Sequence, residues 1–243
     1  MITFKKLLFE EDKVEAAQEV DKLLQTKFQN DLPKLYRASK REFEASYKVL
    51  EFGDEIREPK GSSYDAQIIL DGVAEVIDPD IPKRFESKFA STEYVKGSGL
   101  VFGTNTYVAF PDENSDIVSF SGDTIDFRGD VDAMIADFSG RKPQYPKFNE
   151  MLEKIEELKY RSFIGWTKEN WKDVSTELEN GGIFGTKMLE SIEDYFKAMK
   201  RGAREDSSEI LFSGDQYLYV KPDFFDQYFT RLGGKWKLNP DYN

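Results

Sequence analysis

The chain contains neither cysteine nor histidine, and this absence limits its fold and its chemistry more than any other feature. No disulfide framework can stabilise it, and the usual zinc ligand sets are missing. Folding must therefore depend on buried apolar side chains, and 39% of the 243 residues are hydrophobic, which is enough for a packed core. Nucleophiles activated by histidine are excluded as well. An enzyme of this sequence would use carboxylates, hydroxyls, arginine, lysine or a metal held by carboxylates.

The chain is also acidic, with a formal net charge of −12 at pH 7. Such a charge argues against nucleic acid as a partner, because phosphate binding needs a basic surface. The apolar run near the N-terminus, residues 7–9, is too short for a signal peptide. No stretch approaches the roughly 18 apolar residues of a membrane span. We therefore expect a soluble cytoplasmic protein, of its own cell or of a host cell, with no membrane partner.

The spacing of apolar residues predicts a mixture of helices and strands. The predicted helices span residues 11–29, 65–76, 149–159, 167–181 and 187–200, with Thr167 as an N-cap. The predicted strands span residues 34–38, 100–102, 106–111, 116–120, 208–212 and 216–220. A short turn containing glycine separates the last two strands, which predicts a β-hairpin. Helices and strands are segregated along the chain, which favours an α+β fold.

The expected domain organisation is a single domain over residues 1–243. It consists of an N-terminal helix in residues 1–30, a core in residues 31–222 with a helical insertion at about 144–202, and a C-terminal tail in residues 223–243. The acidic residues between Gly122 and Gly140 do not have the spacing of a calcium-binding EF-hand loop. We interpret them as solvated surface residues, and no metal site is predicted.

Three pieces of the sequence carry residue types that suit an anionic substrate with a neutral leaving group: Arg37, the pair Ser91 and Thr92, and Glu209. Arginine holds phosphate through charge-assisted hydrogen bonds, and a carboxylate beside an anomeric carbon stabilises an oxocarbenium ion. Each piece also has a purely structural interpretation. Arg37 would be a surface or ion-pair residue, the serine–threonine pair would open a turn or cap a helix, and Glu209 would be the polar edge of a strand.

In this order, arginine, then serine–threonine, then glutamate, the sequence resembles ADP-ribosyltransferases of the arginine–serine–glutamate class. More specifically it resembles ADP-ribosyltransferase-like proteins encoded by bacteriophages. The similarity lies in short pieces between residues 30 and 222, namely residues 35–39, 57–59 with 62–63, 102–111 and 208–211. The resemblance implies a mixed or antiparallel β core with flanking helices, and NAD as the substrate of a glycosyl transfer.

The resemblance also implies roles for individual residues. Arg37 would bind the phosphate and ribose of NAD, with Ser91 and Thr92 supporting the site from a central strand. Glu209 would hydrogen-bond the nicotinamide ribose and stabilise the cationic transition state. Two further positions follow from the same comparison: Phe102 would lie near the nicotinamide, and Ser207, two residues before the glutamate, stands where the family engages the acceptor.

Three functions stay open on this evidence. The first is an NAD-dependent ADP-ribosyltransferase encoded by a phage, which modifies a host or defence macromolecule. The second is a catalytically silent protein of the same fold that serves as a virion or interaction component, because a fold does not fix a function. The third is an acidic inhibitor that binds a basic partner by charge complementarity.

Overall fold

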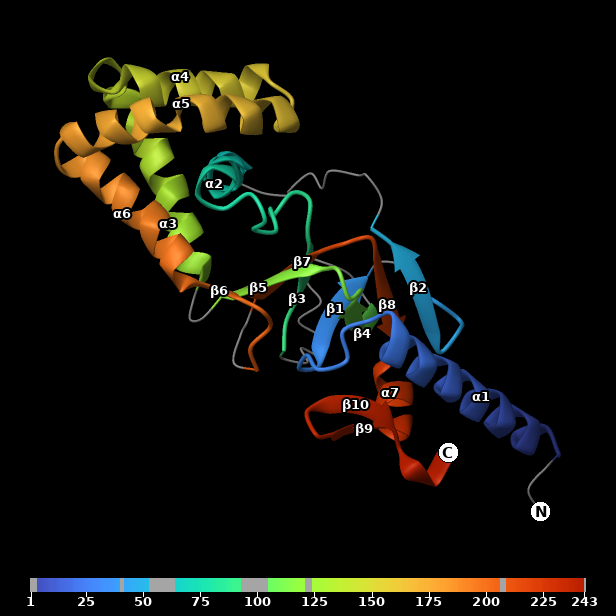
Figure 1. Cartoon of the computed structure of the whole chain (residues 1–243). Coiled ribbons are helices and arrows are strands. Elements are labelled where there is room, and N and C mark those ends of the chain that lie inside the picture. Colours follow the sequence, from blue (N-terminus) through green and yellow to red (C-terminus); the bar gives the residue numbers. More distant parts are fainter. Residues whose placement is uncertain are drawn as a thin grey trace. The chain divides into compact units, whose positions relative to one another are not determined.

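The computed structural model describes residues 4–39, 42–52, 64–92, 105–120, 124–205 and 209–242 (Figure 1). Within them the chain forms seven α-helices and antiparallel sheets, which confirms the α+β prediction. The chain divides into two compact units, each built from separate stretches of sequence. Unit 1 comprises Met1–Asp54, Phe89–Asp116 and Ala203–Asn243, and unit 2 comprises Glu55–Lys88 and Ile117–Gly202. The expected single domain stays a prediction.

Unit 1 is built mainly from strands. Its four-stranded antiparallel sheet has the order β1-β4-β8-β2. The elements of this unit are α1 (Phe4–Thr26), β1 (Leu35–Ser39), β2 (Tyr47–Glu51), β3 (Lys88–Ala90, from Phe89 onward in this unit), β4 (Asn105–Pro111), β7 (Glu209–Ser213), β8 (Gln216–Val220), α7 (Pro222–Tyr228), β9 (Phe229–Leu232), β10 (Lys235–Leu238) and the short 3-10 helix η3 (Pro240–Tyr242).

The core of unit 1 lies between the four-stranded sheet and the helices α1 and α7. Helix α1 places Ala17, Val20 and Leu24 on one face, and all three are buried in this core. The sheet contributes alternate residues, such as Val108 of β4 and Val220 of β8, because successive side chains of a strand point to opposite faces. The intervening residues of both strands therefore belong to the other face of the sheet.

The predicted hairpin of residues 208–212 and 216–220 is wrong. Its two strands exist as β7 and β8, but they belong to different sheets. The chain is redirected by the buried side chain of Asp112, whose Oδ2 accepts hydrogen bonds from the backbone N–H groups of Asp215 (2.8 Å) and Gln216 (2.5 Å). The backbone N–H of Asp112 in turn donates to the carbonyl of Gln216 (3.1 Å). These bonds seat β8 against β4 instead of β7.

Unit 2 is mainly helical. Strand β5 pairs with β6 in antiparallel register, with Val118 opposite Arg201. Figure 1 shows α4 beside α5 and α3 beside α6. The elements are α2 (Tyr64–Ile77), β5 (Asp116–Phe120, from Ile117 onward in this unit), α3 (Thr124–Asp137), the 3-10 turns η1 (Phe138–Gly140) and η2 (Lys142–Gln144), α4 (Pro146–Glu157), α5 (Tyr160–Asn180), α6 (Ile183–Ala198) and β6 (Met199–Arg201).

The predicted N-cap at Thr167 is also wrong, because α5 begins at Tyr160 and runs through this residue. Thr167 is fully buried, and its position is explained by packing. A Cβ atom placed on Gly72 of α2 would lie 2.8 Å from Oγ1 of Thr167, so α2 and α5 approach each other at this pair. The absence of a side chain at Gly72 permits the approach.

The remaining elements predicted from sequence are confirmed apart from their ends. The helix predicted at 11–29 is α1, that at 65–76 is α2, that at 149–159 is α4 and that at 187–200 is α6, while the strands predicted at 34–38, 106–111 and 116–120 are β1, β4 and β5. The strand predicted at 100–102 lies outside the described residues. In the part of the chain that the structure describes, no helix combines the length and the apolar character needed to cross a membrane.

Candidate functional site

The face of the unit 1 sheet away from the core carries Arg37 and three tyrosines. Arg37 lies in the middle of β1, directly opposite Tyr107 of β4. Tyr217 and Tyr219 lie two residues apart on β8 and so share a face. The ring of Tyr219 is stacked on that of Tyr107, with centroids 5.1 Å apart and an interplanar angle of 3°. The guanidinium therefore lies beside a wall of buried phenol rings.

In the part of the chain that the structure describes, the polar contacts of the Arg37 side chain are with neutral groups. Its Nη1 donates to the backbone carbonyl of Phe89 at 2.7 Å, and the guanidinium also hydrogen-bonds the hydroxyl of Tyr219. Its Nε is buried and has no hydrogen-bond partner among the described residues. Burial raises the pKa of Tyr219, and the positive charge of Arg37 opposes that rise only in part. Tyr219 is therefore a neutral phenol at pH 7.

Ser91 lies beside the strand that carries Arg37. The N–H of Tyr36 donates to the carbonyl of Ser91 at 2.7 Å, and the N–H of Ser91 donates to the carbonyl of Tyr36 at 2.9 Å. Thr92 follows, and both hydroxyl residues are half-buried. The structure thus brings Arg37 and the serine–threonine pair, which are far apart in sequence, onto adjacent backbone segments.

Glu209 begins a strand of the same unit. Strand β3 leads directly into Ser91 and lies beside β7, of which Glu209 is the first residue. Glu209 is half-buried, while the following residues 210–212 are fully buried. Arg37, Ser91 and Glu209 therefore lie on successive neighbouring segments of unit 1.

The other predicted site residues, Phe102 and Ser207, lie outside the described residues, as do residues 57–59 and 62–63. Sequence reasoning missed Tyr107 and the role of Tyr219 beside Arg37. Tyr217 and Tyr219 are buried. Their spacing of two is a sequence signal that places both phenols on one face of β8. It does not show that Arg37, on another strand, shares that face.

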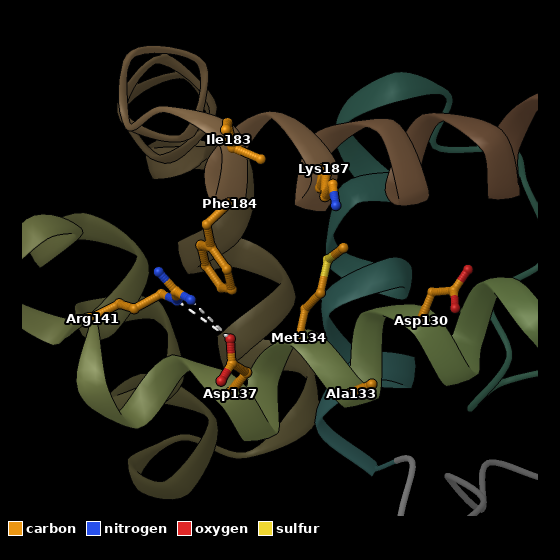
Figure 2. Close-up of a pocket in the computed structure, with 8 residues that line it drawn as sticks. All are labelled: Asp130, Ala133, Met134, Asp137, Arg141, Ile183, Phe184 and Lys187. Carbon is orange, nitrogen blue, oxygen red and sulfur yellow. Dashed lines mark hydrogen bonds and ion pairs between the residues drawn. The ribbon is translucent and has the colours of Figure 1, made fainter.

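A separate cavity of about 440 Å³ lies between α3 and α6 in unit 2. Figure 2 shows its apolar side chains, including Met134 and Phe184, and the ion pair between Arg141 and Asp137 at 3.1 Å. The Arg141 guanidinium also lies 4.8 Å from the centroid of the Phe184 ring. Ile183 at its edge is 79% exposed. The lining offers an apolar surface with charged edges and no nucleophile beside a base.

A smaller cavity of about 280 Å³ in unit 2 is lined in part by Tyr160, whose hydroxyl bonds the buried carboxylate of Asp71. Asp71 of α2 is 3% exposed. It accepts hydrogen bonds from the N–H groups of Arg84 (2.8 Å) and Phe85 (3.0 Å) and from the hydroxyl of Tyr160 (3.0 Å). Burial raises the pKa of Asp71 to about 6, and these hydrogen bonds only partly oppose the rise. Asp71 thereby ties α2 and α5 to the segment that follows α2.

No group of three or more acidic side chains in the described ranges is arranged to hold a metal ion. The arrangement best suited to chemistry is the one around Arg37, which combines a guanidinium, hydroxyl side chains and a carboxylate on a neighbouring segment. Comparison of the chain with models of known protein families, with curated proteins and with solved structures finds no match.

Proposed function

We propose that the protein is an NAD-dependent ADP-ribosyltransferase, encoded by a bacteriophage, that transfers ADP-ribose to a host or defence macromolecule. One observation carries the proposal. The residues named by the sequence resemblance, Arg37, Ser91 and Glu209, come from three distant parts of the chain and lie on successive neighbouring segments of unit 1. The resemblance alone does not require this placement.

The proposed reaction breaks the bond between the nicotinamide nitrogen and C1′ of the ribose. The bonding electron pair leaves with nicotinamide, and an acceptor atom attacks C1′ and loses a proton. Arg37 would hold the diphosphate of NAD through its guanidinium, which suits a phosphate geometrically and electrostatically. The carboxylate of Glu209 would stabilise the positive charge that develops on the ribose. Ser91 and Thr92 would support the site with their hydroxyls.

The test is NAD turnover, measured as nicotinamide release and as transfer of labelled ADP-ribose into proteins of a bacterial lysate. Wild type is compared with Glu209→Gln, which removes the charge and keeps the shape. We expect turnover to fall about a hundredfold or more, the usual effect of removing a transition-state contact. Asp215→Asn is the matched control, because Asp215 is exposed on the turn after β7. Equal turnover in wild type and Glu209→Gln would contradict the role of Glu209.

A second candidate is a catalytically silent interaction protein, either a virion component or an inhibitor of a basic partner. The observation that favours it is the cavity between α3 and α6, where Ile183 is exposed beside Phe184. Exposed apolar patches edged by charge are typical of protein-binding sites. The same experiment separates the two candidates, because an interaction protein would neither bind NAD nor release nicotinamide. Binding that weakens steeply with salt would favour the inhibitor.

A further inference from the structure

The smaller cavity of unit 2, with a volume of about 280 Å³, is lined mostly by charged side chains. The carboxylate of Glu75 contacts two lysines at once, Lys83 at 2.8 Å and Lys168 at 3.0 Å. Arg161 contacts Glu86 at 3.5 Å. Three cations and two carboxylates thus line the cavity, which gives it a net charge of +1 in a chain whose net charge is −12. An excess of positive charge in a cavity attracts an anion.

The buried carboxylate of Asp71, which accepts a hydrogen bond from the Tyr160 hydroxyl, does not cancel this excess. Burial raises the pKa of Asp71 to about 6, and the positive charge of Arg84 acts in the opposite direction. Asp71 and Arg84 are both 3% exposed. A protonated Asp71 carries no charge, and the charge of an ionised Asp71 is balanced by the guanidinium of Arg84.

Arg161 and Lys168 of α5 are the cations of the lining that a ligand can reach from solvent. Their side chains are 71% and 57% exposed. The contact of Arg161 with Glu86 is made through Nε, and a guanidinium has further N–H donors on its two terminal nitrogens. Such donors match the two oxygens of a carboxylate. An anion can therefore bond Arg161 and leave the ion pairs of Glu75 intact.

The apolar part of the lining comes from Tyr160 and Ile164, on the same helix as Arg161. Both side chains are buried. The ring of Tyr160 is stacked on that of Phe85, with centroids 4.8 Å apart, and its hydroxyl is held by Asp71. This wall is therefore fixed by packing and by a hydrogen bond, and it suits a small apolar group attached to the anion.

Gly165 gives a separate reason to expect a ligand in this cavity. It lies within α5 and lines the cavity. A Cβ atom at Gly165 would meet no atom within 4 Å, so packing does not require glycine here, in contrast to Gly72. The helical backbone does not require it either, and glycine within a helix is destabilising relative to alanine. The absence of a side chain keeps space open beside the backbone, which a close-fitting ligand needs.

We propose that this cavity binds a small monocarboxylate, with the carboxylate bonded to Arg161 and Lys168 and the apolar part against Tyr160 and Ile164. The net charge of the lining matches a singly charged ligand better than a phosphate monoester, which carries about −1.5 to −2 at pH 7. All the residues of the site belong to unit 2. The proposal goes beyond the proposed NAD chemistry and does not depend on it.

The experiment adds benzoate to the ¹⁵N-labelled full chain and follows the backbone amide resonance of Gly165, which is identified by its loss in Gly165→Leu. We expect a saturable shift with a dissociation constant of about 1 mM, as is usual for a ligand of this size. Benzamide has nearly the same shape and no charge. It should bind about tenfold more weakly or less, because it lacks the charge-assisted hydrogen bonds.

Two variants locate the site. Arg161→Gln removes the guanidinium and Gly165→Leu fills the cavity, and each should weaken benzoate binding about tenfold or more. In Gly165→Leu the amide of Ile164 reports binding, and thermal unfolding checks that the variant is folded. Lys172→Gln and Thr176→Leu are the matched controls, because both residues are exposed on the same helix and lie outside the cavity lining. The controls should bind benzoate within about twofold of wild type.

The outcomes that contradict the proposal are distinct from those for NAD turnover. Benzoate that does not shift the Gly165 amide in wild type would overturn the proposal. Equal affinity for benzamide and benzoate would overturn the assignment of an anionic ligand. Benzoate binding that is unchanged in Arg161→Gln or in folded Gly165→Leu would place the ligand elsewhere and would also overturn it. None of these results changes the expected effect of Glu209→Gln on nicotinamide release.

Discussion

Asp71 and Asp112 are buried acidic residues whose carboxylates accept hydrogen bonds mainly from backbone N–H groups. Hydrogen bonds of this kind join segments that are distant along the chain, and a carboxylate with two oxygens can satisfy several donors at once. For Asp71 burial outweighs the hydrogen bonds and raises its pKa to about 6.

The raised pKa of Asp71 predicts how stability changes with pH. The neutral form of Asp71 is favoured in the folded state, so Asp71 contributes to the free energy of unfolding. This contribution is complete below the pKa of about 3.9 in the unfolded chain, and it is lost as pH rises through about 6. Relative to Asp71→Asn, wild type should lose about 2 kcal/mol of unfolding free energy between pH 4.5 and 7.5. Urea unfolding of both proteins at several pH values measures this difference. A difference that does not vary with pH would contradict the prediction.

Substitution of Asp112 should lower the free energy of unfolding by a larger amount, and this loss is measurable at a single pH. Its Oδ1 accepts hydrogen bonds from Asn114 N–H (3.1 Å) and the Ser115 hydroxyl (2.9 Å), in addition to the two bonds that seat β8. In Asp112→Asn the amide NH₂ faces donors, so we expect a loss of about 3 kcal/mol. Urea unfolding at pH 7 measures it. Asp116→Asn is the control, because Asp116 is exposed, and an equal loss in both variants would contradict the explanation.

At the scale of elements, the contact between α2 and α5 depends on a missing side chain. Gly72→Ala would place a methyl group against Thr167, whose Oγ1 is buried without a hydrogen-bond partner in the described residues. We expect Gly72→Ala to lower the unfolding free energy by about 1–3 kcal/mol, as overpacking does. Adding Thr167→Ala should recover most of the loss, because it removes Oγ1 and Cγ2, the two atoms of Thr167 that the new methyl group would approach most closely.

The matched control for this pair is Gly165→Ala in α5. A Cβ atom on Gly165 would meet no atom within 4 Å, so the substitution should raise stability by up to about 1 kcal/mol through helix propensity alone. Thermal unfolding of the three variants and of the double mutant gives the comparison. If Gly72→Ala were as stabilising as Gly165→Ala, the close approach of the two helices would not restrict residue 72.

Helices with one apolar face, such as α1, α4 and α6, were predictable from sequence because their periodicity reflects burial on a single side. Two errors have a common cause. The hairpin of β7 and β8 and the N-cap at Thr167 were predicted from local patterns, and long-range contacts decided both. Asp112 redirects the chain over more than a hundred residues, and Gly72 meets Thr167 from a different helix.

The same limit applies to the candidate site. Arg37 was predictable as a charged residue on a strand, and Glu209 as the start of another. The stacked tyrosines beside Arg37 were not predictable, because the stacking of Tyr107 on Tyr219 depends on the order β1-β4-β8. Sequence alone gives each strand its two faces and does not give the order of strands in a sheet.

For the whole molecule, the net charge of −12 at pH 7 and an isoelectric point near 4.7 predict the pH dependence of solubility. Mutual repulsion keeps the chains apart near neutral pH and disappears when the net charge approaches zero. Light scattering between pH 4 and 8 should therefore rise to a maximum close to pH 4.7. Reducing agents should leave the profile unchanged, because the chain has no cysteine. Scattering that stays flat across this range would contradict the prediction.

The strand order of unit 1 has a consequence for synthesis on the ribosome. Strand β2 is at the edge of the sheet, and its partner there is β8. Glu51 pairs with Gln216, so β2 leaves the ribosome long before its partner exists, by on the order of ten seconds at typical translation rates. During that interval its backbone N–H and C=O groups lack their final partners, and such strands readily join neighbouring chains. The nascent protein is thus most exposed to aggregation before residue 216 is added.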